Sequence, residues 1–380
     1  MVSIDTVIPK AHIFRFENFW VQQPGFYDCV KEVWSRTTKS QHSSGILTEK
    51  LKALRKALKI WGKSLSKLRL LIAKCNTVIL FFDTLEEERQ LFVQEANFRK
   101  AVKFHLECLM RAQFLYWKKR CTMRWIKLGE ENSKFFHAMA TERFRRNSMA
   151  SITLADGTVI SDHEQMAAVA WNCYKQRMGT TNAIDMQYDL DVLIPAVEGL
   201  ESLADPFTTD DIDSVIKSMP LDRAPGPHGF NGMFMRKCWD IVKHDFYNLA
   251  QDFHSGNVQL ENINTSFITL VPKKSSPEQM SDYRPISLTN CCLKFITKLL
   301  ADRLQSKIEN CIHRNQYGFI KGRTIQDRLA WSFEYIHQCH SSKKPIVILK
   351  LDFEKAFDSV EFQAIYLIMS RMGFPESYIT

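Results

Sequence analysis

The sequence has no long hydrophobic run, which excludes an ordinary membrane-spanning helix. Apolar stretches such as VILFF at residues 78–82 are far shorter than the roughly 20 residues that a helix needs to cross a bilayer. The N-terminus also lacks the charged and then apolar pattern of a secretory signal. We therefore expect an intracellular protein.

Cysteines are present but carry no metal or disulfide signature. The ten cysteines include no C-x-x-C pair, and Cys291 and Cys292 are adjacent, so neither a disulfide framework nor a zinc ribbon is indicated. The segment HQCH at residues 337–340 is the densest group of zinc-type ligands. Because it lacks a second ligand group, exposed polar residues on a helix are the simpler interpretation.

Positive charge is abundant and gathered in blocks. The 380 residues are 45% hydrophobic and 24% charged, with a net charge of +9, which allows cores in two or three domains. Residues 99–148 hold 13 Lys or Arg, 4 Glu and no Asp, and residues 50–74 hold nine basic residues and no acidic one. Aromatic residues interrupt the first block, as in surfaces that follow phosphates and stack bases. A solvated helix face is the alternative.

The first part of the chain is predicted to be mainly helical. Residues 11–16 alternate like a strand, and residues 26–34 look helical. Apolar residues at a 3–4 spacing from Leu51 to Ile72 predict a long helix. Its expected partner is Phe98–Arg120, after a chain reversal around residues 76–88, which gives a long basic helical hairpin.

The second part is predicted to mix strands and helices. The expected elements are a β-hairpin turning on Asp156 and Gly157, a linker at 180–206, a capped helix at 208–219, a Pro/Gly-dense loop at 224–232, extended segments at 266–274 and 282–288, and a helix at 290–312.

One carboxylate stands at a special place in this pattern. Ile346–Leu351 has the length and β-branched content of a buried strand. Asp352 would then lie at the C-terminal end of a strand, where open α/β sheets place their chemistry. The alternative is that this aspartate only caps a helix.

Four segments carry a resemblance. They are APGPHGFNG (224–232), ITLVPKK with DYRPISLTNCCLKFITKLLADRL (268–304), NQYGFIKGRTIQD (315–327) and LKLDFEKAFDSV (349–360). In this order they resemble the fingers and first palm motif of reverse transcriptases from non-LTR (LINE-type) retrotransposons, closest to the plant lineage. RWIKLGEENSKFFH (124–137) resembles the element that precedes the polymerase, and FENFW (16–20) resembles the end of the family's endonuclease domain.

The resemblance implies roles for individual residues. In such polymerases two Mg²⁺ ions about 4 Å apart activate the primer and neutralise the triphosphate. By resemblance, Asp352 is the catalytic first metal ligand and the backbone carbonyl of Phe353 a second metal contact. The implied nucleotide-binding residues are Lys273 and Arg284, whose cations suit phosphate oxygens, and Phe357 beneath the sugar. The implied template or nucleotide vicinity comprises Gln316, Gly318, Phe319, Arg323 and Asp327.

The basic block supplies the expected nucleic-acid-binding residues. They are Lys118, Lys119, Arg120, Arg124, Lys127, Lys134, Arg143, Arg145 and Arg146.

Two positions depart from the family pattern. His228 replaces the usual aspartate of the Pro/Gly loop, and we expect the loss of that charge to loosen the loop. Glu130 replaces an aspartate before the SKFF segment and keeps the charge.

The sequence contains no second palm motif and no Ala-Asp-Asp turn. Because Mg²⁺ demands several oxygen ligands, Asp352 alone cannot assemble the two-metal site, and we expect a truncated polymerase that is inactive on its own. Two alternatives stay open. The chain is either a non-catalytic nucleic-acid-binding remnant or a degenerate reading frame without a stable fold.

The expected fold class is α+β: a long helical hairpin followed by reverse-transcriptase fingers and an incomplete α/β palm, a fragment of a right-hand polymerase. The expected domains are a residual endonuclease-like tail and linker (1–43), the basic hairpin (44–121), an N-terminal extension and linker (122–206) and a partial reverse transcriptase domain (207–380). The implied cofactor is Mg²⁺. The implied partners are an RNA template, a DNA primer and a complete polymerase copy in trans, without a membrane, and the family implies nuclear residence.

Overall fold

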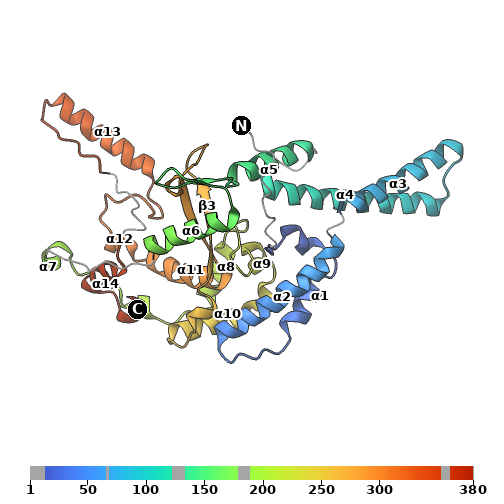
Figure 1. Cartoon of the computed structure of the whole chain (residues 1–380). Helices are drawn as coiled ribbons and strands as arrows, with labels where there is room; N and C mark the ends of the chain where they lie inside the picture. The colour runs from blue at the N-terminus through green and yellow to red at the C-terminus, as the bar shows by residue number, and fades with distance from the viewer. Residues whose placement is uncertain (1–12, 66–67, 122–132, 179–188, 352–359, 380) are drawn as a thin grey trace. The chain divides into compact units, whose positions relative to one another are not determined.

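The computed structural model describes residues 13–65, 68–121, 133–178, 189–351 and 360–379. Its described residues are mainly helical, with two small antiparallel sheets, consistent with the expected α+β class (Figure 1). The chain divides into two compact units: Met1–Ser161 with Ile212–Phe295, and Asp162–Asp211 with Ile296–Thr380. We call them unit 1 and unit 2. None of the described helices is long and apolar enough to cross a membrane.

An aromatic cluster forms one part of the core of unit 1. Phe16 is fully buried, its ring lies 5.5 Å from that of Phe234, and its backbone N–H donates to the carbonyl of Gly229 at 2.8 Å. The predicted alternation of residues 13–16 is present, because Phe14 and Phe16 are buried and their neighbours exposed. Residues 13–16 form no strand, because the backbone N–H of Phe16 bonds to Gly229 of the Pro/Gly loop and not to another strand. The next elements are η1 (Asn18–Gln22) and α1 (Phe26–Trp34), and Phe234 lies in α9 (Gly232–Lys237).

The last residues of the helix predicted at Leu51–Ile72 fall in α3 (Leu68–Glu88), and its first part is α2 (Ser43–Leu65). Helix α2 packs on α1 and on α10 (Trp239–His254), and Leu47, Leu51, Leu54 and Leu58 are fully buried. On α10, the Asp245 carboxylate accepts bonds from the Trp34 indole at 2.6 Å and the Lys50 ammonium at 2.7 Å. The expected pairing with residues 98–120 is therefore wrong for this helix.

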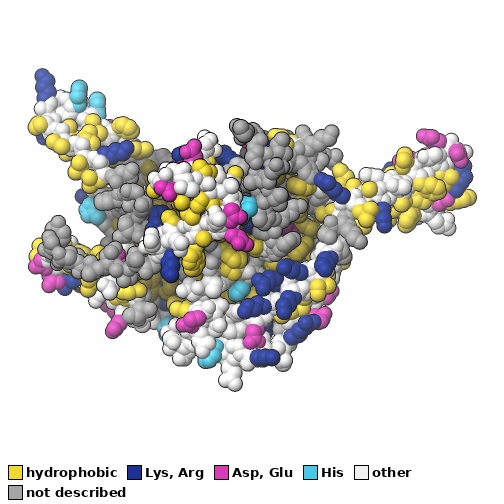
Figure 2. Space-filling view, viewed as in Figure 1, with side chains coloured by type: hydrophobic (Ala, Val, Ile, Leu, Met, Phe, Trp, Pro, Cys, Tyr) yellow, Lys and Arg dark blue, Asp and Glu magenta, His cyan; other side chains and the backbone are white. Residues whose placement is uncertain are grey.

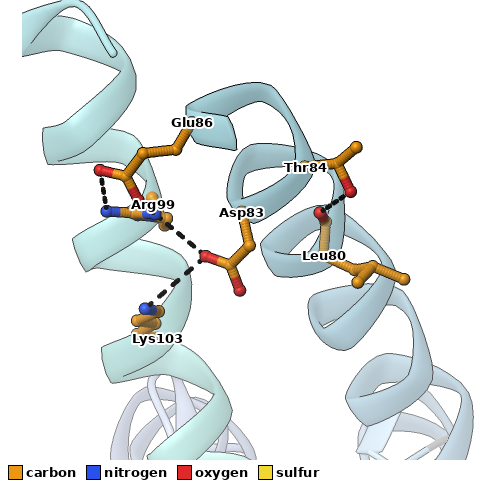
Figure 3. Close-up of polar contacts among 6 residues, drawn as sticks. All are labelled: Leu80, Asp83, Thr84, Glu86, Arg99 and Lys103. Carbon is orange, nitrogen blue, oxygen red and sulfur yellow. Dashed lines mark hydrogen bonds and ion pairs between the residues drawn. The ribbon is translucent and has the colours of Figure 1, made fainter. Parts of the chain in front are cut away.

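Residues 98–120 instead pack on a second helix. α3 (Leu68–Glu88) and α4 (Val93–Cys121) lie side by side and antiparallel (Figure 1). The chain reverses at residues 89–92, later than the predicted 76–88, and the Glu95 carboxylate stabilises that turn by accepting from the Phe92 N–H at 2.8 Å and from Arg89. Figure 3 shows Arg99 of α4 bonded to Asp83 and Glu86 of α3.

Two β-hairpins lie in unit 1. β1 (Ile152–Thr153) pairs with β2 (Val159–Ile160), and the predicted turn is confirmed by Gly157, whose φ is +85°. β3 (Ser266–Pro272) pairs antiparallel with β4 (Tyr283–Thr289), with Ser266 opposite Thr289 and Pro272 opposite Tyr283. Both extended segments predicted at 266–274 and 282–288 are confirmed. The remaining short elements here are η3 (Leu260–Asn262) and η4 (Met280–Asp282).

Helices make up the described part of unit 2. A small core joins Leu200, Leu203 and Phe374. Helix α11 (Cys291–Gln305), which begins in unit 1 and continues in unit 2, ends before the predicted residue 312. Helix α8 (Thr209–Ser218), which lies mostly in unit 1, is the predicted capped helix. Unit 1 also contains α5 (Ser133–Asn147). The other elements of unit 2 are α6 (His163–Met178), α7 (Leu190–Leu193), η2 (Glu201–Ala204), α12 (Ile308–Cys311), α13 (Ile325–Ser341), α14 (Phe362–Arg371) and α15 (Glu376–Ile379).

The predicted buried strand at Ile346–Leu351 is wrong. These residues are assigned to no strand and are exposed, Val347 to 94%. A strand is stabilised by its neighbours across the sheet, and the described strands β1 to β4 pair only with one another. β-Branched residues alone therefore do not produce the strand that was to position Asp352.

Candidate functional site

The two predicted triphosphate-binding cations lie on the β3–β4 hairpin of unit 1. Arg284 is opposite Val271, and the backbone N–H of Lys273 continues the ladder by donating to the Asp282 carbonyl at 2.7 Å. Because side chains alternate along a strand, Lys273 and Arg284 share one face as diagonal neighbours, a separation of roughly 7–8 Å between such positions. Both residues are exposed. The hairpin thus presents two cations together.

The turn of this hairpin is fixed by one carboxylate. Asp282 accepts from the backbone N–H groups of Gln279 at 3.0 Å and Glu278 at 2.9 Å, and it pairs with the Lys274 ammonium at 3.0 Å. These hydrogen bonds, the backbone ones first, lower the pKa of Asp282 to about 2. Lys274 is therefore balanced by a charged partner, whereas the Lys273 ammonium donates to the neutral carbonyl of Ser281 at 2.8 Å. Asp282 therefore offsets the charge of Lys274 and not that of Lys273.

The Pro/Gly loop packs tightly beside β4. A Cβ on Gly226 would lie 2.3 Å from the Thr289 carbonyl oxygen, so this position requires glycine for close approach. The His228 N–H donates to the Asn290 side chain at 3.0 Å, and Arg55 donates to the Pro227 carbonyl at 3.1 Å. We expected His228 to loosen this loop, whereas the structure holds it from two sides and buries His228.

The His228 side chain lies against the adjacent cysteines that begin α11. The potential ligand atoms of His228, Cys291 and Cys292 all lie within 4.8 Å of one another. Hydrogen bonding with Cys292 and with His228 lowers the pKa of Cys291, while its bond to Cys291 and burial raise the pKa of Cys292. The sequence did not reveal this cluster because His228 is distant along the chain from both cysteines.

The predicted template-vicinity residues lie in unit 2. The Arg323 guanidinium donates to the carbonyls of Gln316 at 2.8 Å and His313 at 3.1 Å, so it holds the loop that precedes α13. The Gln316 amide donates to the Gly318 carbonyl at 3.3 Å. Asp327 and Thr324 cap α13: the Thr324 hydroxyl donates to the carboxylate at 2.7 Å and accepts from the Asp327 N–H at 3.2 Å.

Phe319 has an unusual backbone within that loop. Its φ is +65° and its side chain is 92% exposed, a conformation that is rare and strained for a bulky residue. An exposed aromatic ring on a loop held by Arg323 is suited to stacking on a base.

Part of the predicted basic surface is used for internal contacts. Arg120 pairs with the Glu17 carboxylate at 2.8 Å and lies 3.3 Å from the Tyr116 ring centre, and Lys118 lies over the Phe114 ring. Arg124 and Lys127 fall outside the described residues, and the structure does not describe the side chains of Lys119 and Lys134.

The exposed arginines that were predicted to bind nucleic acid lie on α5. Arg143, Arg145 and Arg146 are exposed. Arg145 and Arg146 line an open hollow of about 820 Å³ together with one acidic residue, Glu142, and with Ser275, which follows β3. This hollow brings the basic end of α5 next to the hairpin that carries Lys273. A phosphate backbone is the kind of ligand such a surface attracts.

A second basic surface lies on α2, outside the predicted residues. Figure 2 shows Lys and Arg side chains gathered over this helix. Lys52, Lys56 and Lys59 are exposed on the side away from the buried leucines, and Lys52 and Lys56 line an open hollow of about 610 Å³ with Arg36 and Trp61. The basic block at residues 50–74 was the sequence signal for it.

Asp352, Phe353 and Phe357 fall in residues 352–359, outside the described residues. The described groups that could hold a metal are the nitrogen and sulfur atoms of His228, Cys291 and Cys292, which do not suit Mg²⁺.

Comparisons with known proteins agree with the motifs. Residues 271–380 match the family model described as reverse transcriptase (RNA-dependent DNA polymerase). The whole chain is 24% identical to the transposon TX1 uncharacterized 149 kDa protein of Xenopus laevis, and covers 29% of it.

Two further relatives match shorter parts. The Pol polyprotein of the type-1 retrotransposable element R2 of Popillia japonica is 32% identical to this chain. The match covers 30% of this chain and 16% of that protein. The Pol polyprotein of the type-1 retrotransposable element R1 of Bradysia coprophila is 24% identical to this chain. The match covers 50% of this chain and 20% of that protein. The chain thus spans less than a third of each of these relatives. Together these matches support a LINE-type reverse transcriptase, with the domain match at residues 271–380.

Proposed function

We propose that this chain supplies the nucleic-acid-binding and nucleotide-binding part of an RNA-directed DNA polymerase of a LINE-type retrotransposon. The observation that carries the proposal is the β3–β4 hairpin, which presents Lys273 and Arg284 on one face next to the exposed arginines of α5. The family match over residues 271–380 supports it. A triphosphate would bind the hairpin cations, and the template–primer duplex would follow the arginines.

Nucleotide binding is tested by photocrosslinking a photoreactive deoxynucleoside triphosphate to the purified chain. Charge-assisted hydrogen bonds contribute enough that K273A and R284A should each reduce labelling about tenfold. Lys274→Ala is the matched control because its ammonium is already paired with Asp282, and it should label like the wild type. Equal labelling of all four proteins would refute the assignment of the hairpin.

Duplex binding is tested by fluorescence anisotropy with an RNA template annealed to a DNA primer. The double variant R145E/R146E should weaken binding and lower the slope of log K against log salt by roughly 0.7–0.9 for each phosphate that the variant no longer neutralises. The double variant R236E/K237E changes the net charge equally at exposed positions of α9 and should leave the slope unchanged. If both variants bind with the same reduced affinity, only the overall charge matters and the α5 surface is not the site.

We further propose that Asp352 is a catalytic metal ligand and that the isolated 380-residue polypeptide does not extend a primer. The reason is chemical: two Mg²⁺ ions need more carboxylates than one, and the sequence contains no Ala-Asp-Asp segment. If the wild type extends a primer with Mg²⁺ and D352A does not, Asp352 is supported as a metal ligand. The proposal that the isolated polypeptide is inactive is then contradicted. Addition of a complete polymerase copy would test whether the chain acts in trans.

The second candidate function is a non-catalytic nucleic-acid-binding protein. The exposed lysines of α2, an element separate from the β3–β4 hairpin, favour it. In that case K52E/K56E/K59E abolishes steeply salt-dependent RNA binding, while K273A and R284A have no effect on any activity. Nuclear residence, which we propose from the family alone, is tested by imaging a fluorescent fusion.

A further inference from the structure

The His228–Cys291–Cys292 cluster is buried, and one of its potential ligand atoms has no hydrogen-bond partner. His228 is 6% exposed, Cys291 3% and Cys292 0%. The Nδ1 atom of His228 is buried without a hydrogen-bond partner. A buried polar atom left unpaired costs about 1–3 kcal/mol, and in native structures such an atom is normally satisfied by protein, water or a bound ion.

The backbone around the cluster is held by contacts that do not involve the three side chains. Asn290, directly before the cysteines, accepts from the His228 N–H at 3.0 Å. Its amide nitrogen donates to the Thr265 hydroxyl at 2.7 Å and the Ile263 carbonyl at 3.2 Å. On the other side, the Lys294 ammonium donates to the Ala224 carbonyl at 2.9 Å. Loop and helix are therefore placed in advance, which is what a preformed ligand set requires.

We propose that His228, Cys291 and Cys292 bind one thiophilic metal ion, Zn²⁺ or Cu⁺, which joins the Pro/Gly loop to the start of α11. One imidazole and two thiolates are donors that these ions prefer, and that Mg²⁺ does not. Binding replaces the two thiol protons, which leave to solvent, so atoms and charges balance without an oxidant. The ligand chemistry of this site differs from that of the carboxylate site proposed at Asp352.

Charge and coordination number distinguish the two ions. With two thiolates, Zn²⁺ gives a neutral buried site, which avoids the cost of burying net charge. Zn²⁺ is normally four-coordinate, and the described residues offer three ligands, so a small exogenous ligand would complete its shell. Cu⁺ accepts fewer ligands but leaves one negative charge buried. Both ions are therefore tested.

The test starts from the full chain, purified in reductant and freed of metal by chelation. One portion receives Zn²⁺ and another, under anaerobic conditions, Cu⁺ in the presence of a competing chelator. After gel filtration, metal analysis should find one equivalent of one of the two ions. C291S, C292S and H228Q should each weaken retention at least about tenfold. Cys238→Ser is the matched control, because Cys238 is a buried cysteine outside the cluster, and it should retain the ion.

A second measurement uses only the wild-type chain, so it does not depend on the folding of any variant. Titration with Co²⁺, a Zn²⁺ substitute, should produce sulfur-to-cobalt charge-transfer bands that saturate at one equivalent and disappear when Zn²⁺ is added. Failure to retain either ion, together with the lack of these bands, overturns the proposal. Retention that is unchanged in a folded H228Q/C291S/C292S triple variant also overturns it, because other thiols would then hold the metal.

Discussion

Substitution of Gly226 by alanine tests the packing of the Pro/Gly loop most directly. The new Cβ would lie 2.3 Å from the Thr289 carbonyl oxygen and 2.7 Å from that of Leu288. Both are backbone atoms of β4, so neither can rotate away as a side chain could. The backbone must therefore shift by about 1 Å to reach an ordinary contact, and overpacking of this kind costs roughly 1–3 kcal/mol.

The assay is thermal unfolding followed by circular dichroism. For a domain of 150–250 residues about 1 kcal/mol lowers Tm by roughly 2–4 °C, so we expect a decrease of roughly 2–12 °C. Gly318→Ala is the control, because its Cβ would meet only the Gln316 amide nitrogen, at 3.6 Å, and the expected change is within about 0.5 kcal/mol.

A local readout complements the melting temperature. The displaced loop should expose the thiols of Cys291 and Cys292, so their alkylation under native conditions should accelerate in G226A and not in G318A. If G226A melts with the wild type and its two thiols react at the wild-type rate, the loop does not pack against β4 as described.

Three further predictions concern the strand turn, the core and the helical arm formed by α3 and α4. The pKa of Asp282 is lowered to about 2 from an ordinary value of 3.8. The stability that the charged Asp282 gives to the fold is therefore complete above the ordinary pKa and is lost as pH falls. The Tm difference between the wild type and D282N should shrink between about pH 4 and pH 2. Leu54→Ala, at a fully buried position, should lower the free energy of unfolding in urea by about 2–5 kcal/mol, whereas Leu70→Ala, at a 49% exposed position, should have little effect. Arg99→Ala removes the ion pairs to Asp83 and Glu86 and should accelerate amide hydrogen exchange in α3 and α4; an unchanged exchange rate would show that these pairs do not hold the arm.

Periodicity predicted that helices form, but not what covers them. The spacing from Leu51 correctly predicted the buried face of α2. It could not identify α1 and α10 as the covering elements, because an apolar stripe specifies only that some surface must cover it. The reversal at residues 89–92 was missed for a similar reason, since the apolar residues of α3 continue past 76 although none is buried.

Charge counting has the same limit at the candidate sites. Arg99 and Arg120 add to the surplus of residues 99–148, yet both are paired, with α3 and with Glu17 respectively. A sequence gives the number of charges, and only the fold shows which have partners. Likewise, the adjacency of Cys291 and Cys292 was visible, but the third member of the cluster arrives through a loop distant in sequence.

The exposed segment 346–351 has a consequence for the fate of this polypeptide in a cell. An extended apolar stretch, with Val347 and Leu349 94% and 77% exposed, is a surface that chaperones and proteases select and that other chains can pair with. Lys343, Lys344 and Lys350 flank or interrupt it, in the positions where charged gatekeepers limit aggregation. We therefore expect cellular quality control to act on this segment and to limit how much of the polypeptide accumulates.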